Sequence, residues 1–155
     1  MQIAIIIHSE TGHTLAVATK MQTKLIAAGH QVSLARIQAR NDREVDEQKI
    51  EFINCPKLPI ADAYIFGAPV RGFMLSPLMK AYLNQIDDLS KKPVICFLTQ
   101  HFPFKWMGGN QAMKKFKALL LNKNAHIKNH HIFNWSAKKK REKQINVAIH
   151  QLDFS

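Results

Sequence analysis

The sequence has few cysteines, few acidic residues and no long hydrophobic run. Cys55 and Cys96 are its only cysteines, too few for a disulfide framework and without the spacing of a Cys or His metal site. No segment approaches the roughly 18 consecutive apolar residues that cross a membrane. The apolar run at residues 3–7 lacks the basic segment that begins a signal peptide. We therefore expect a soluble cytoplasmic protein with no membrane span, no disulfide and no metal site.

The shortage of acidic residues is confined to the second part of the chain. Lys and Arg total 22 against 11 Asp and Glu, which gives a formal net charge of +11 and a pI near 9.9. Residues 1–90 carry nine basic and nine acidic side chains, whereas residues 91–155 carry thirteen and two. The excess charge predicts anionic partners.

Length and hydrophobic patterning predict one α/β domain covering residues 1–155. The chain is 46% apolar and 21% charged, as in globular proteins of about 100–200 residues per domain. Five apolar segments have the pattern of strands buried on both faces of a parallel sheet, and they lie at residues 3–7, 32–37, 63–67, 94–98 and 131–135. Apolar residues at helical spacing follow most of them, at residues 15–25, 78–86, 112–120 and 145–152.

Residues 38–61 form the exception, because their pattern is compatible with a short helix followed by a loop.

The repeated order of strand and helix predicts an open parallel sheet with helices on both faces. Ligands of such sheets bind at the edge where the strands end, so we expect the functional residues there.

The loop after the first strand has the composition of a phosphate-binding loop. It reads Ser9-Glu10-Thr11-Gly12-His13-Thr14 and leads directly into the first helix. Gly12 permits a tight turn, the hydroxyl groups donate hydrogen bonds, and the N-terminus of a helix favours an anion. A simple turn with a hydroxyl helix cap is the alternative. Neither the GxxxxGK[ST] motif of a P-loop nor the GxGxxG dinucleotide motif is present.

This loop, directly after an N-terminal buried strand, resembles the phosphate loop of the flavodoxin family, which holds the phosphate of FMN. Two further segments carry the resemblance. Residues 66–73, followed by Leu75-Ser76-Pro77, resemble the loop on one side of the flavin ring, and residues 99–110 resemble the loop on its other side. The resemblance implies a short-chain member, with a three-layer α/β/α sandwich around a five-stranded parallel sheet of order 2-1-3-4-5.

The resemblance also implies a role for each loop. Residues expected at the phosphate are Ser9, Glu10, Thr11, Gly12, His13 and Thr14. Those expected at the ring are Ala68, Pro69, Val70, Arg71, Gly72 and Phe73, and those expected at its pyrimidine side are Thr99, Gln100, His101 and Phe102. Arg71 could face the reduced ring or be a solvated surface residue. The aromatic residues of segment 102–106 could stack on the ring or wedge the loop onto the sheet. The flavin would carry the chemistry, so no residue is expected to be catalytic.

Basic residues are expected beside this site. Lys138, Lys139, Lys140 and Arg141 begin the last helix, where positive charge opposes the helix dipole. With Lys105 they would form a basic flank suited to an acidic redox protein or to the phosphates of NAD(P)H. A solvated basic face is the alternative.

Three functions remain open from the sequence. The first is an FMN-binding redox protein that transfers electrons. The second is an NAD(P)H-dependent quinone or flavin reductase of the same fold, for which a homodimer could complete the nicotinamide pocket. The third is a polyanion-binding protein without flavin, which is disfavoured because no zinc spacing or nucleic-acid motif accompanies the charge.

Overall fold

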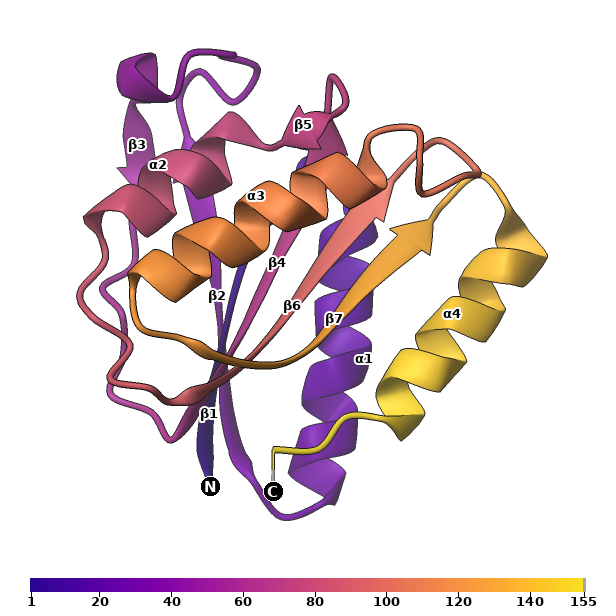
Figure 1. Cartoon of the computed structure of the whole chain (residues 1–155). Helices are drawn as coiled ribbons and strands as arrows, with labels where there is room; N and C mark the ends of the chain where they lie inside the picture. The colour runs from indigo at the N-terminus through magenta and orange to yellow at the C-terminus, as the bar shows by residue number, and fades with distance from the viewer. Residues whose placement is uncertain (155) are drawn as a thin grey trace.

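Five long parallel strands form the centre of the sheet in the computed structural model, which describes residues 1–154 (Figure 1). They run in the order β2-β1-β4-β6-β7, which confirms the predicted order. Their bounds are Gln2–His8 for β1, Gln31–Ala39 for β2, Ala63–Arg71 for β4, Pro93–Gln100 for β6 and His126–Asn134 for β7.

Two short antiparallel strands were not predicted. β3 (Phe52–Asn54) pairs with β2 at the sheet edge, and β5 (Met74–Leu75) pairs with the end of β4. The helical part of the segment at residues 38–61 is a single turn at Glu47–Lys49, where Asp46 accepts a hydrogen bond from the Gln48 backbone at 3.0 Å. Strands of two and three residues are too short to show an alternating pattern, so no periodic signal could reveal them.

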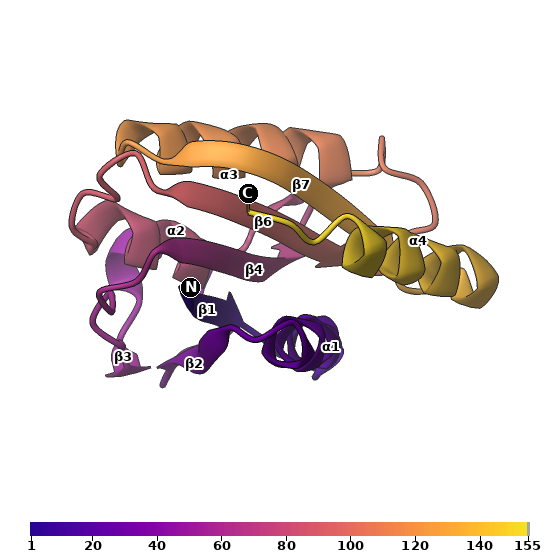
Figure 2. The same ribbon diagram turned by 90° about the horizontal axis from the view of Figure 1, so that it is seen from below.

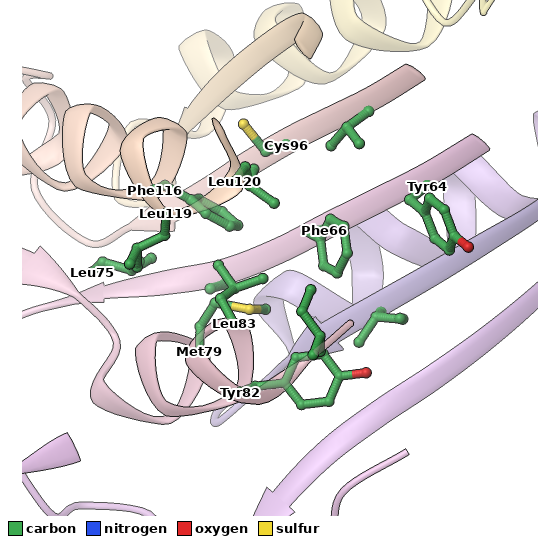
Figure 3. Close-up of a cluster of buried hydrophobic side chains, with 14 of the residues drawn as sticks. Tyr64, Phe66, Leu75, Met79, Tyr82, Leu83, Cys96, Phe116, Leu119 and Leu120 are labelled. Carbon is green, nitrogen blue, oxygen red and sulfur yellow. The ribbon is translucent and has the colours of Figure 1, made fainter. Parts of the chain in front are cut away.

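Helices cover both faces of the sheet, as a three-layer sandwich requires (Figure 2). α1 (His13–Ala27) and α4 (Lys138–His150) lie on one face, and α2 (Pro77–Gln85) and α3 (Gly109–Asn122) on the other. Figure 3 shows the core beneath α2 and α3, where Phe66, Tyr82 and Phe116 pack together. The second core lies beneath α1 and α4.

The position of β1 explains its composition. It pairs with β2 on one side and β4 on the other, and Ile3 to Ile7 are at most 2% exposed. Ile6 belongs to the core under α2 and α3, whereas Ile5 and Ile7 belong to the other. Since both faces are buried, an uninterrupted apolar run is required. The parallel arrangement brings the loops after β1, β4, β6 and β7 to one edge.

The sequence also predicts no disulfide and no membrane-spanning segment. Both cysteines are free, with Cys55 exposed and Cys96 buried in the core. Across residues 1–154, the helices all fall short of the length and hydrophobicity needed to cross a membrane.

Candidate functional site

The loop after β1 forms an open turn at the N-terminus of α1. Gly12 adopts φ 93°, and a Cβ atom built there would meet nothing within 4 Å. The hydroxyl of buried Ser9 accepts a hydrogen bond from the Leu15 backbone at 3.1 Å. Gly12 provides no side-chain cap, and the first turn of α1 has no acidic residue. The positive end of the helix therefore faces open space beside Gly12, as an anion site requires.

Thr14 connects this loop to the end of β6. Its hydroxyl lies 2.9 Å from that of Thr99, and both residues are buried. Two segments separated by 85 positions are thus joined at the floor of the site. Thr11, by contrast, is exposed beside Gly12, so its hydroxyl remains accessible to a ligand.

Charged neighbours neutralise the acidic residue of the loop. The Glu10 carboxylate forms an ion pair with Arg71 and lies 3.9 Å from the Arg43 guanidinium. Arg36 supports the loop from β2 by donating to the Ser9 carbonyl. The negative charge of Glu10 is compensated, which reduces its repulsion of an anion bound at Gly12.

Arg71 is held within this network. Its guanidinium donates to the Asp42 carbonyl, lies 3.7 Å from the Asp42 carboxylate and pairs with Glu10. The side chain is 18% exposed. Arg71 therefore joins the loops after β1, β2 and β4, and is not a freely solvated arginine.

His8, the last residue of β1, contacts both the loop after β2 and the start of α2. Its Nδ1 lies 2.8 Å from the Ser76 hydroxyl and its Nε2 lies 2.7 Å from the Asp42 carboxylate. Burial lowers the pKa of His8, against the opposing effect of Asp42. Ser76 is fully buried, and its oxygen accepts the Met79 N–H at the start of α2. This chain of hydrogen bonds has the order of a serine hydrolase triad, but its serine is inaccessible and serves as a helix cap.

Two aromatic residues from different loops stack on each other. Phe73 lies in the two-residue turn between β4 and β5, where both Gly72 and Phe73 have positive φ. Its ring faces that of Phe102, with centroids 5.3 Å apart and planes 2° from parallel. The Phe73 backbone packs against Gly108, whose added Cβ would lie 2.6 Å from the Phe73 Cα. The loops expected on the two sides of the flavin ring thus touch each other.

Gln100 supports the loop that carries Phe102. Its side chain is buried, and its Nε2 donates to the carbonyls of Phe102 at 3.1 Å and Phe104 at 2.6 Å. Asn134 also donates to the Phe102 carbonyl, at 2.9 Å. His101 is exposed. Of the residues expected at the pyrimidine side, Thr99 and Gln100 lie beneath the loop, and His101 and Phe102 lie on it.

Trp135 had not been expected at this site from the sequence. Its ring stacks on His13 at a centroid distance of 4.3 Å, and the guanidinium of Arg141 lies 4.6 Å from its centroid. Burial and the nearby Arg141 lower the pKa of His13. Trp135 directly follows β7, and this position at the carboxyl edge was the signal that could have identified it.

The basic start of α4 lies against the same edge. Lys140 donates to the Pro103 carbonyl at 2.8 Å, and its ammonium group lies 5.4 Å from the Phe104 centroid. Lys105, Lys138 and Lys139 are exposed. The start of α4 therefore lies against the loop that contains Lys105.

A family model described as a flavodoxin domain matches residues 4–134. The chain belongs to the flavodoxin family. No curated protein matches this sequence closely enough to count as a relative.

Solved structures show the same fold at low sequence identity. A flavodoxin from Streptococcus pneumoniae TIGR4 is 16% identical with a TM-score of 0.67, and the match covers 98% of this chain and 97% of that one. The Trp repressor binding protein of Bacillus subtilis is 12% identical with a TM-score of 0.71, and 99% of each chain is covered. The azoreductase AzrA is 10% identical with a TM-score of 0.62, covering 97% of this chain and 96% of that one.

Membership of the family implies a flavin cofactor, and the residues present fit one. The open turn at Gly12 offers a place for a phosphate, with a helix N-terminus behind it and a compensated carboxylate beside it. Phe73 and Phe102 offer aromatic surface for a ring system. A planar ring sandwiched between them would need face-to-face spacing of about 7 Å, twice the roughly 3.5 Å of an aromatic contact, so the pair must separate to admit it.

Proposed function

We propose that this flavodoxin binds FMN at the carboxyl edge of its sheet and transfers electrons through it. The observation that carries the proposal is the open backbone turn at Gly12, which faces outward at the start of α1. The bound flavin would accept and release one or two electrons. The protein would supply binding and positioning, so no protein side chain needs to act as a general acid or base.

The surrounding residues suggest how the site would hold its ligand. Thr11 and the backbone N–H groups beside Gly12 would donate to the phosphate. Phe73 and Phe102 would pack against the ring, and Gln100 would keep the Phe102 loop in place through its two carbonyl contacts. The paired Glu10 and Arg71 would hold the phosphate and ring loops together.

A reductase that uses NAD(P)H remains a second candidate, supported by one observation. Phe73, Phe104 and Trp106 are 50%, 50% and 73% exposed near the same edge. This apolar surface could receive a second planar molecule, such as a nicotinamide or a quinone. An acidic redox protein is the partner we propose for the electron carrier, because Lys138, Lys139 and Lys105 are exposed beside the site.

The visible absorption spectrum tests the cofactor proposal. Purified protein is mixed with FMN, passed through a gel-filtration column and examined for flavin bands in the protein fraction. Thr11→Arg should abolish FMN retention by filling the turn. Thr23→Arg is a matched control, since Thr23 is exposed near the other end of α1, and it should retain FMN like the wild type.

Failure of the wild type to retain FMN would contradict the proposal, as would equal retention by Thr11→Arg. Steady NADPH consumption in the presence of a quinone would favour the reductase. Its absence, with flavin bound and reducible by an acidic redox protein, would favour the carrier.

A further inference from the structure

A concave site lies at the outer edge of β7 and is lined by residues other than those of the turn at Gly12. Its volume is about 350 Å³, within the range of small-molecule sites. Residues from the Lys105 loop, the start of α3, β7 and α4 line it, among them Lys105, Asn110, His131, Ile132, Lys140 and Lys143. Figure 2 shows β7 as the last long strand on this side, with α3 and α4 on opposite faces of the sheet. None of the lining residues comes from segments 9–14 or 68–73.

The lysines of this cavity carry uncompensated charge. Among the residues that the structure describes, none of Lys105, Lys140 and Lys143 forms a salt bridge. Lys140 is directed to a carbonyl and an aromatic ring, which leave its charge in place. No acidic residue lines the cavity. Three positive charges around a concave surface raise the local concentration of anions.

Two histidines at the cavity have lowered pKa values, caused first by burial and then by neighbouring basic groups. Burial, together with His130 and Lys105, lowers the pKa of His131 to about 4. The pKa of His130 is also lowered, by burial and by Lys117 and Lys105. A neutral His131 leaves the lysines as the charges of the site and can itself donate or accept a hydrogen bond.

The strand edge adds a backbone donor. The N–H groups of His130 and Asn134 point away from β6, since they donate to Asn129 Oδ1 and Gln144 Oε1, each at 2.9 Å. Alternation along a strand directs the N–H of Ile132, midway between them, to the same outer edge. This N–H lies in the segment that lines the cavity and would complement the lysines in binding anionic oxygens.

We propose that this cavity binds a small organic phosphate. The lysines and the Ile132 N–H would hold the phosphate, and the apolar part of the ligand would rest on Ile132, Phe133 and Val147, which also line the cavity. The site is separate from the FMN site proposed above and does not depend on it. Lys105 belongs to the loop at residues 101–107, and Lys140 donates a hydrogen bond to the Pro103 carbonyl of the same loop. A ligand in the cavity would therefore lie beside this loop.

Binding of adenosine 5′-monophosphate, measured by calorimetry and by NMR of the histidine rings, tests this proposal. We expect saturable binding, an upward shift of the pKa of His131 from about 4, and no binding of uncharged adenosine. The double variant Lys105→Gln/Lys143→Gln should bind the nucleotide at least about tenfold more weakly, the effect of roughly 1.4 kcal/mol of lost attraction.

Two control variants distinguish binding in this cavity from attraction by net charge and from binding at the turn. Lys24→Gln/Lys115→Gln removes the same charge from exposed positions outside the cavity and should bind like the wild type. Thr11→Arg should bind the nucleotide normally, because the turn at Gly12 is not part of this site.

Three results would overturn the proposal. These are no binding of the nucleotide by the wild type, equal weakening in both lysine double variants, and loss of binding in Thr11→Arg. The second result would indicate attraction by net charge alone. The third would indicate binding at the turn. None of these outcomes depends on whether FMN is retained.

Discussion

The rings of Phe73 and Phe102 stack with nearly parallel planes, and their centroids lie 5.3 Å apart. Each belongs to a loop that the flavodoxin resemblance places on a different side of the flavin ring. The contact brings the two loops together, although Phe73 is 50% and Phe102 37% exposed. In the proposed FMN site, entry of the flavin between the two rings would exchange one aromatic contact within the protein for two contacts with the ligand.

This exchange predicts that the aromatic pair slows FMN association. An aromatic pair contributes roughly 0.5–1.5 kcal/mol, so Phe102→Leu should accelerate association by up to about tenfold. The quenching of FMN fluorescence in a stopped-flow instrument measures this rate. Phe104→Leu alters an aromatic residue of the same loop outside the pair and should leave it unchanged. An unaltered rate in Phe102→Leu would show that the pair does not limit entry.

Gly108 should be intolerant of any side chain. Its φ of 105° disfavours other residues by about 1–2 kcal/mol, and an added Cβ would lie 2.6 Å from the Phe73 Cα. We expect Gly108→Ala to reduce the free energy of unfolding by more than Gly29→Ala. Gly29 has a similar φ of 94° but open space around it. Urea denaturation of both variants measures the difference, and equal losses would mean that the close approach to Phe73 costs nothing.

The buried His8 predicts acid sensitivity. Because folding lowers the pKa of His8 below its usual 6.5, the unfolded chain binds more protons as the pH falls through this region, and stability declines. The groups facing the ring are Ser76, Asp42, Arg71 and Glu10. Substituting a non-titrating residue, His8→Gln, should flatten the fall in unfolding free energy between pH 7.5 and 5.5, as measured by urea denaturation. A slope identical to that of the wild type would argue against His8 as its source.

The two thiols should differ sharply in reactivity. Cys55 is exposed, whereas burial raises the pKa of Cys96 to about 12. Since the thiolate is the reactive form, a chromogenic disulfide reagent should modify one thiol quickly and the second only after denaturant is added. Cys55→Ser should remove the fast phase alone. Fast modification of two thiols in the native protein would contradict the burial of Cys96.

The central strands were predictable because burial on both faces leaves a continuous apolar run, as at Ile3–Ile7. The start of α2 was also predictable, since Ser76 and Pro77 have the residue types of a helix cap and first turn. β5 was not predictable, because it consists only of Met74 and Leu75 and depends on the turn before it.

The side-chain partners within the site were less accessible to sequence reasoning. Arg71 had two plausible environments, and its ion pairs with Glu10 and Asp42 depend on how three loops meet. Gln100 is the last residue of β6, a strand that is buried along almost its whole length. Its hydrogen bonds to the Phe102 and Phe104 carbonyls depend on the path of the loop that follows the strand. Such contacts arise from tertiary packing, which local patterns do not encode.

The stack of His13, Trp135 and Arg141 also has a consequence for synthesis. The loop after β1 leaves the ribosome long before its packing partners in β7 and α4. Thr14 contacts Thr99, and His13 contacts Trp135, which Arg141 of α4 covers. A nascent chain therefore lacks the packing partners of this loop until β7 and α4 have emerged, and chains released before α4 never acquire them.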